Sequence, residues 1–266
     1  MTAVQNAPTV APGVAPDRAG SRTGIPMVRL TWIELRKLAD TRSGLWLLIV
    51  IGLAAAGTAA IMLLAVADEE QTFAGLFTFG LVPASVLLPV LGILSMTSEW
   101  SQRTALTTFT LVPARWRVIA AKLIAAVLIA VATTVAAAAL SAAANLIAIG
   151  TGGDGSWHLD AVLVGKLLLN QVLYVLMGSA FGALLMNSPL AIVLYFAVPT
   201  VWTVLGEMVK WLHKAAGWLD INVTTLPLSE PDMTGEQWTR LGVAAAVWVL
   251  LPLVLGTVRV LRREVS

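Results

Sequence analysis

Six long apolar runs dominate this chain, and each is near the length that a helix needs to cross a bilayer. A transmembrane helix crosses about 30 Å of hydrocarbon with about 20 residues. Hydrophobic residues make up 58% of the 266 positions, more than a soluble domain of this size could bury. The sequence therefore predicts an all-α integral membrane protein with six transmembrane helices. The expected spans are Leu45–Ala67, Phe73–Met96, Val118–Ile149, Ala161–Met186, Leu190–Val209 and Leu241–Val258.

The chain divides into a short tail and a transmembrane domain. Residues 1–27 are rich in Ala, Pro, Gly and Thr and lack apolar periodicity, so we expect a disordered cytoplasmic tail. The tail also lacks the apolar core of a signal peptide, which argues against a cleaved targeting segment. Residues 28–266 then form one six-helix domain. Pro83 and Pro89 are expected to interrupt its second span, and Lys210–Leu219 to form a short interfacial or re-entrant helix before an irregular cap.

An amphipathic helix is predicted over residues 28–41, directly before the first span. Val28, Trp32, Leu35 and Ala39 fall on one stripe at helical spacing, while basic residues such as Arg36 fall on another face. Such a helix lies in the interface plane with its basic face toward anionic headgroups. The alternative is a plain helical linker that leads into the membrane.

Charge asymmetry sets the expected orientation. If the N-terminus is cytoplasmic, only four of the 17 basic residues lie on the outer side, namely Lys166, Lys210, Lys214 and Arg240. The positive-inside rule then predicts that both termini are cytoplasmic in a multi-pass protein of the plasma membrane. An even number of spans agrees with this arrangement.

Several chemistries find no support in the sequence. The chain has no GxxxxGK[ST] phosphate-binding loop, no HExxH motif and no cysteine. The pair Glu69 and Glu70 lies in a turn with no arginine at the spacing of intramembrane CAAX-type proteases. His158 and His213 are too scattered for a metal site. We therefore expect no enzyme, no cofactor or metal on this chain, and no nucleic-acid partner.

The connection between the second and third spans carries an unusual cluster of charge. Glu99, Arg103, Arg115, Arg117 and Lys122 fall within 25 residues of a chain in which 12% of residues are charged. Arginines can make bidentate contacts with carboxylates of a partner. The plainer reading is that the basic residues only follow the positive-inside rule, and that Lys122 snorkels to the interface as an anchor. That rule gives no reason for an acid such as Glu99 on the inner side.

This segment, EWSQRTALTTFTLVPARWRVIAAKL, resembles the signature region of ABC-2-type transporter permeases. Those chains commonly carry an acidic residue, a Gly-Thr pair, a short apolar stretch, Pro-x-Arg, and a Lys-Leu pair that begins the third span. One departure is Arg103, which stands where glycine usually precedes the threonine. With an amphipathic helix, six spans and a larger segment between spans five and six, the resemblance covers about residues 28–263. The matching residues are Glu99, Thr104, Leu106, Leu111, Pro113, Arg115, Lys122 and Leu123.

The resemblance implies a membrane subunit of an ATP-driven exporter with a type V exporter-like architecture. The ATPase would be a separate dimeric chain that binds ATP and Mg, and a second permease subunit would complete a homo- or heterodimer in the bilayer. The segment Thr104–Arg117, including Pro113 as the helix break and Arg115, would be the coupling helix that rests on the ATPase. Glu99 would pair with a basic residue of the amphipathic helix or of the ATPase.

Polar residues within the spans are candidates for a translocation path. Asn170 and Glu207 are the two possible pathway residues, since polar groups in lipid are costly and face protein or water. For Asn170 the commoner role is a hydrogen bond to a neighbouring helix. For Glu207 an ordinary interfacial acid is an equal alternative. Lys166 lies near the outer end of its span and is expected to snorkel.

Two functions of different classes stay open. One is the exporter permease, moving a lipophilic drug, antibiotic or lipid-like substrate outward. The other is a non-transporting six-span scaffold, sensor or immunity protein. A secondary carrier is weaker, because no charged relay for protons or sodium runs through the membrane midplane.

Overall fold

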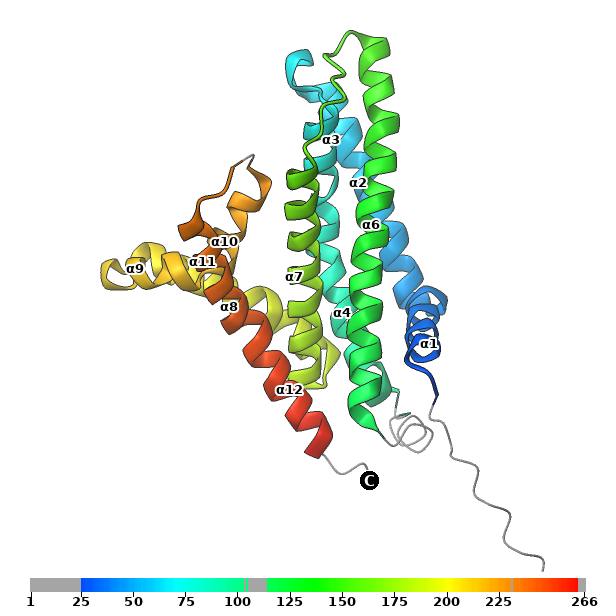
Figure 1. Ribbon diagram of the computed structural model, residues 1–266, viewed down its shortest axis with the longest axis vertical. Helices are drawn as coiled ribbons and strands as arrows, with labels where there is room; N and C mark the ends of the chain where they lie inside the picture. Colours follow the sequence, from blue (N-terminus) through cyan, green and yellow to red (C-terminus); the bar gives the residue numbers. More distant parts are fainter. Residues whose placement is uncertain (1–24, 103, 105–113, 231, 263–266) are drawn as a thin grey trace, which may run out of the picture.

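A computed structural model describes residues 25–102, 104, 114–230 and 232–262. Within these ranges the chain is helical, and six segments are long and apolar enough to cross a membrane. The membrane-length segments are α2 (Arg42–Ala65), α3 with α4 (Phe73–Gly80 and Val82–Ser101), α6 (Arg115–Thr151), α7 (Ala161–Leu185), α8 (Ser188–Met208), and α11 to α12 (Gly235–Ala245 and Leu251–Arg262). Figure 1 shows α2, α3, α4, α6 and α7 along the long axis and α8 and α12 slanting away from them, with the two ends of the described chain at the same end of the bundle.

The expected interruption of the second span occurs at one of its two prolines. The break between α3 and α4 falls at Leu81, and Pro83 lies in the first turn of α4, where no helical amide hydrogen bond is lost. Pro89 lies inside α4 without ending it. Its predicted role as an interruption was therefore wrong: the packed neighbours hold the helix through that position.

The centre of the bundle is the contact between α4 and α7, with α2, α6 and α8 around α4. Small residues let the two backbones approach closely. A Cβ at Gly92 would lie 2.6 Å from the Val175 carbonyl oxygen, and one at Gly178 would collide with the backbone of Pro89. Dense packing of small residues is the usual basis of helix association in a membrane.

The segment between α8 and α11 forms a helical cap. Helix α9 (Lys210–Leu219) confirms the short helix expected there. The rest of the cap contains α10 (Ile221–Thr225) and the 3-10 turn η2 (Leu226–Ser229), so the prediction of an irregular cap was wrong. The Asp220 side chain accepts hydrogen bonds from two amides at the start of α10, a capping signal that lies in the sequence.

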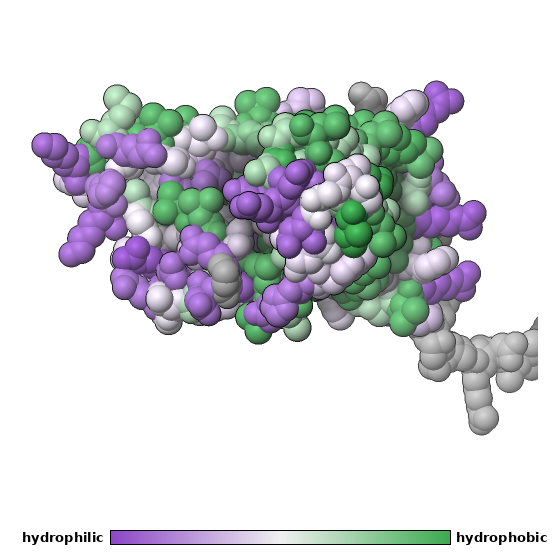
Figure 2. Space-filling model, turned by 90° about the horizontal axis from the view of Figure 1, so that it is seen from above, coloured by the Kyte–Doolittle hydropathy of each residue, from purple (hydrophilic) through white to green (hydrophobic). Residues whose placement is uncertain are grey.

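The last span is longer than expected and changes its winding midway. A π-helical turn, η3 (Ala246–Leu250), joins α11 to α12. Beside it the Trp248 indole donates to the Leu219 carbonyl oxygen of α9 at 2.6 Å, which ties this span to the cap. The loop end opposite α1 is viewed in Figure 2, where hydrophilic residues gather on the end face and apolar residues border them.

Candidate functional site

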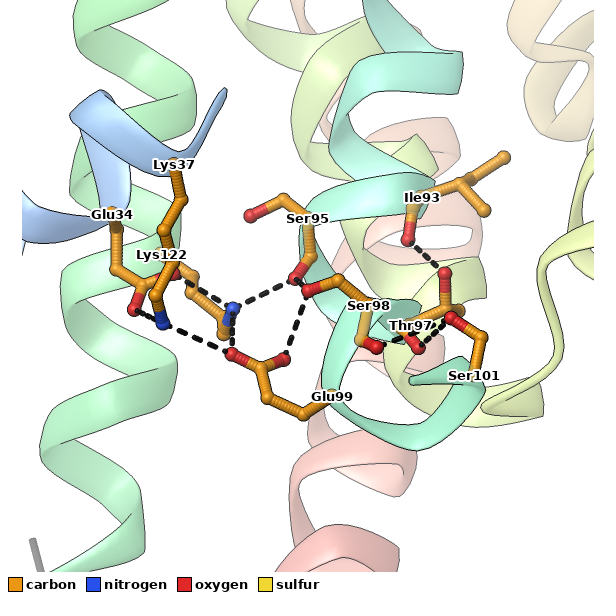
Figure 3. Close-up of polar contacts among 9 residues, drawn as sticks. All are labelled: Glu34, Lys37, Ile93, Ser95, Thr97, Ser98, Glu99, Ser101 and Lys122. Atoms are coloured by element: carbon orange, nitrogen blue, oxygen red, sulfur yellow. Dashed lines mark hydrogen bonds and ion pairs between the residues drawn. The ribbon is translucent and has the colours of Figure 1, made fainter. Parts of the chain in front are cut away.

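Four charged side chains from three helices meet at the end of the bundle where α1 lies. Helix α1 (Met27–Asp40) supplies Glu34 and Lys37, the last turn of α4 supplies Glu99, and the start of α6 supplies Lys122. Figure 3 shows the four side chains pointing toward one another across the gap between these helices. We call Glu34, Lys37, Glu99 and Lys122 the charge ring.

The ring is closed by four ion pairs with alternating sign. The Lys122 Nζ lies 2.7 Å from Glu99 Oε1 and 2.8 Å from Glu34 Oε2. The Lys37 Nζ lies 2.7 Å from Glu34 Oε1 and 3.4 Å from Glu99 Oε1. Two acids and two bases leave the ring without net charge, and each ammonium bridges both carboxylates.

Hydrogen bonds to α4 complete the site. Lys122 Nζ donates to the Ser95 carbonyl oxygen at 2.8 Å, so its three donors all have acceptors. The Ser98 hydroxyl donates to Glu99 Oε2 at 3.1 Å. The ring therefore links the end of the second span to the start of the third, with α1 bound to both.

Burial makes the pairing obligatory for three members. The side chains of Glu34, Glu99 and Lys122 are 7%, 7% and 5% exposed, whereas that of Lys37 is 42% exposed. A buried charge that loses its partner is strongly destabilising. Burial by itself would lower the pKa of Lys37, but Glu34 and Glu99 outweigh it, and the pKa is raised above its ordinary value of 10.5.

The face of α1 that binds the bundle differs from the stripe that the sequence indicated. The buried residues of α1 include Leu30, Glu34 and Leu38. Val28 and Trp32 of the expected stripe are 82% and 68% exposed and point away from the rest of the protein. Spacings of four residues put the buried three on one side of the helix. Besides the two faces expected from the sequence, the helix has a face that packs on α6, where Glu34 pairs with Lys122 and Leu30 contacts Val118 and Ala121.

Lys122 was expected to anchor the third span by snorkelling, and this was wrong. Its side chain points into the protein, because two carboxylates and a carbonyl oxygen lie within hydrogen-bond reach there. Lys166 at the other end also fails to snorkel: it is 3% exposed and donates to the Glu230 carbonyl oxygen above η2.

The remaining coupling candidates lie near the ring without joining it. Arg115 Nη1 donates to the Val260 carbonyl oxygen of α12 at 3.2 Å, and Arg117 Nη2 donates to the Ile25 carbonyl oxygen at 2.5 Å. Thr104 is exposed, and its amide donates to the Glu99 carbonyl oxygen at 2.9 Å. Arg103 and Pro113 lie outside the described residues.

The two possible pathway residues are not part of this site. Asn170 is half-buried on α7, and among the described residues its Oδ1 has no hydrogen-bond partner. Glu207 is exposed near the end of α8. Nothing in their surroundings assigns either of them to a path.

A cavity of about 570 Å³ lies beside the ring. Its walls come from α1, the start of α2, the second half of α4, the start of α6 and the first residue of α8, and Glu34, Lys37 and Glu99 are among the lining residues. Within the described ranges no three His, Cys, Asp or Glu side chains gather as metal ligands would. The site offers paired charges and an adjoining hollow with both polar and apolar lining residues.

Glu34 is the ring member that sequence reasoning missed. Its signal was present, because an acid three residues before Lys37 sits on the stripe with Leu30 and Leu38. By contrast, Lys37 is the basic residue of the amphipathic helix that Glu99 was expected to find. Comparison of the sequence with protein-family models gives no match, and comparison with curated proteins gives none either.

Proposed function

We propose that this chain is the membrane-spanning permease subunit of an ABC exporter. In this proposal both termini face the cytoplasm, two permease subunits form the translocation path, and a separate dimeric ATPase binds and hydrolyses ATP. The substrate class we favour is lipophilic, moved outward. The proposal rests on the ABC-2-like order of residues from Glu99 to Leu123 and on six membrane-length helices.

The observation that carries the proposal is that two paired members of the charge ring, Glu99 and Lys122, lie near the two ends of that segment. The connection from 102 to 114 leaves α4 three residues after Glu99 and enters α6 seven residues before Lys122. A force on the connection would therefore act on two spans that Glu99 and Lys122 hold together at 2.7 Å. A coupler needs this stiffness, because a flexible joint would dissipate the displacement that ATP hydrolysis causes.

The lipid-facing surface agrees with an assembly in the bilayer. Leu53 and Leu64 on α2 are 68% and 87% exposed, and Val193 on α8 is 61% exposed. These apolar faces need lipid or another subunit to cover them. They support a membrane location and leave room for a second permease subunit.

Co-purification from native membranes tests the proposal. The tagged full-length protein should retain a chain with a phosphate-binding loop, identified by mass spectrometry. Thr104→Arg places a bulky cation on the connection and should release that ATPase. Thr151→Arg is the matched control, since Thr151 is an exposed threonine at the other end of α6.

The two outcomes that contradict the account are distinct. Absence of any ATPase with the unchanged protein would refute the permease proposal and favour the non-transporting scaffold. Retention of the ATPase by Thr104→Arg at the level of Thr151→Arg would refute only the placement of the contact.

A further inference from the structure

The cavity beside the charge ring has the character of a site for an amphiphile. It is partly open, and the residues where α1 leads into α2 line part of it. Leu30 and Ile33 of α1 and Leu91 and Leu94 of α4 are among its lining residues and give it an apolar part. The other part is bounded by charged ring members. A hollow of this kind at the interface level suits a molecule with both a polar head and an acyl chain.

The polar half presents charges of both signs. Glu34 and Glu99 line it with carboxylates that retain acceptor positions, since a carboxylate offers about four. Lys37 also lines it and is the ring member with appreciable exposure, 42% of its side chain. Within the described residues, Glu34 and Glu99 take two of its three N–H donors, which leaves one donor for a ligand.

Two further groups point to a bound ligand. Ser95 is 6% exposed and lines the cavity, and its hydroxyl has no hydrogen-bond partner among the described residues. Figure 3 shows this hydroxyl turned from α4 toward the side on which α1 lies. The amino terminus of α2 also forms part of the wall through Thr41, Ser43 and Gly44. A helix amino terminus favours phosphate.

We propose that this cavity binds a glycerophospholipid whose headgroup carries a primary ammonium, as phosphatidylethanolamine does. The ammonium lies against Glu34 and Glu99. The phosphate takes the remaining Lys37 donor and faces the start of α2, and the acyl chain follows Leu91 and Leu94 toward the bilayer. The bound lipid would brace α1 against α4. This inference goes beyond the exporter proposal and does not depend on it.

The charge pattern selects this headgroup over others. An anionic headgroup such as phosphatidylglycerol brings no cation to the two carboxylates. Phosphatidylcholine brings a cation, but its trimethylammonium cannot donate a hydrogen bond. Loss of a charge-assisted hydrogen bond corresponds to about a tenfold weaker affinity.

Lipid competition on the purified full-length protein tests the proposal. The protein is delipidated in mild detergent and offered the three lipids with identical dioleoyl chains, and bound lipid is counted by native mass spectrometry. We expect phosphatidylethanolamine to bind about tenfold more tightly than either competitor. Leu94→Trp, which fills the apolar half, should abolish this preference, whereas Leu128→Trp on an exposed position of α6 should keep it.

The outcomes are decisive with the unchanged protein alone. Equal retention of all three lipids indicates unselective boundary lipid and overturns the proposal. Preference for phosphatidylglycerol overturns the charge assignment, and absence of bound lipid overturns the proposal as a whole. Ile33→Trp narrows the same cavity from α1 and provides a second variant if Leu94→Trp does not fold.

Discussion

The two ends of the bundle bury polar groups differently. At the α1 end, three charged side chains lie below a tenth exposed and pair with one another across helices far apart in sequence. At the other end no such charge pairs are found among the described residues: the buried Lys166 donates to the Glu230 carbonyl oxygen, and two buried amides donate to carbonyl oxygens nearby in the sequence. Gln71 donates to the Val66 carbonyl oxygen at 3.0 Å, and Asn145 donates to that of Gly155 at 2.9 Å.

The two kinds of contact differ in how far apart in the sequence their partners lie. The two amide-to-carbonyl bonds of Gln71 and Asn145 join residues within ten positions, so they hold local turns. The charge ring joins Glu34 to Lys122, 88 positions apart, and so fixes the relative placement of α1, α4 and α6. Charged bonds are stronger when intact and costlier when broken, which makes the ring end the sensitive one.

Removing one ring charge should have the largest effect. Lys122→Met leaves Glu34 and Glu99 buried without their main partner, and we expect unfolding free energy to fall by about 3–5 kcal/mol. Titration with SDS in mixed micelles measures it. Lys214→Met, at an exposed position of α9, is the control and should change stability by about 0.5 kcal/mol or less. A similar loss of unfolding free energy in both variants would show that the ring charges do not contribute more to stability than an exposed charge does.

Exchanging two charges should cost less than the two single changes added together. Glu99→Lys and Lys122→Glu each leave three like charges in the ring, whereas the double variant keeps the attraction between positions 99 and 122, although Lys37 and Glu34 then each adjoin a like charge. A thermodynamic cycle on the four proteins should give a coupling energy of about 2 kcal/mol or more. Additive losses would show that the ring acts by shape and packing instead of charge.

Truncation at the other end should cost less. Asn145→Ala deletes one neutral hydrogen bond to the Gly155 carbonyl oxygen, and a loss of about 1–2 kcal/mol is expected in the same titration. A loss as large as that of Lys122→Met would erase the contrast between the two ends.

Alkaline pH should weaken the contribution of Lys37 to the ring by a small amount. The pKa of Lys37 is raised in the folded protein, so its contribution is complete below about pH 10.5 and is lost as the pH rises through the folded value. Because the side chain is 42% exposed, the effect should be about 1 kcal/mol or less. Comparison with Lys37→Gln between pH 9 and pH 12 isolates it from the other titrating groups. Identical alkaline profiles would contradict the assignment.

The sequence was sufficient for the elements governed by local hydropathy. Each of the six spans follows from its own composition, and their edges moved by a few residues because caps such as Thr41 and Asp160 end or begin the helices. The sequence also indicated that Glu99 pairs with a basic residue, because the positive-inside rule does not explain an acid on the inner side.

The ring itself depends on contacts that sequence periodicity does not encode. Leu30, Glu34 and Leu38 share one side of α1, but Glu34 interrupts its apolar character, so a search for apolar residues favours Val28 and Trp32 instead. Lys122 is at the edge of an apolar run, where snorkelling is the usual outcome in isolation. Its true direction is decided by Glu34, 88 residues away.

Photo-crosslinking in native membranes would show whether a separate ATPase rests beside the charge ring, as we propose. A photoreactive amino acid replaces Gln102, which is exposed just beyond α4, or Glu69, which is exposed at the other end of the bundle. The account predicts that the Gln102 probe captures a protein with a phosphate-binding loop and that the Glu69 probe does not. Capture of that protein from Glu69, or its absence from Gln102, would contradict the account.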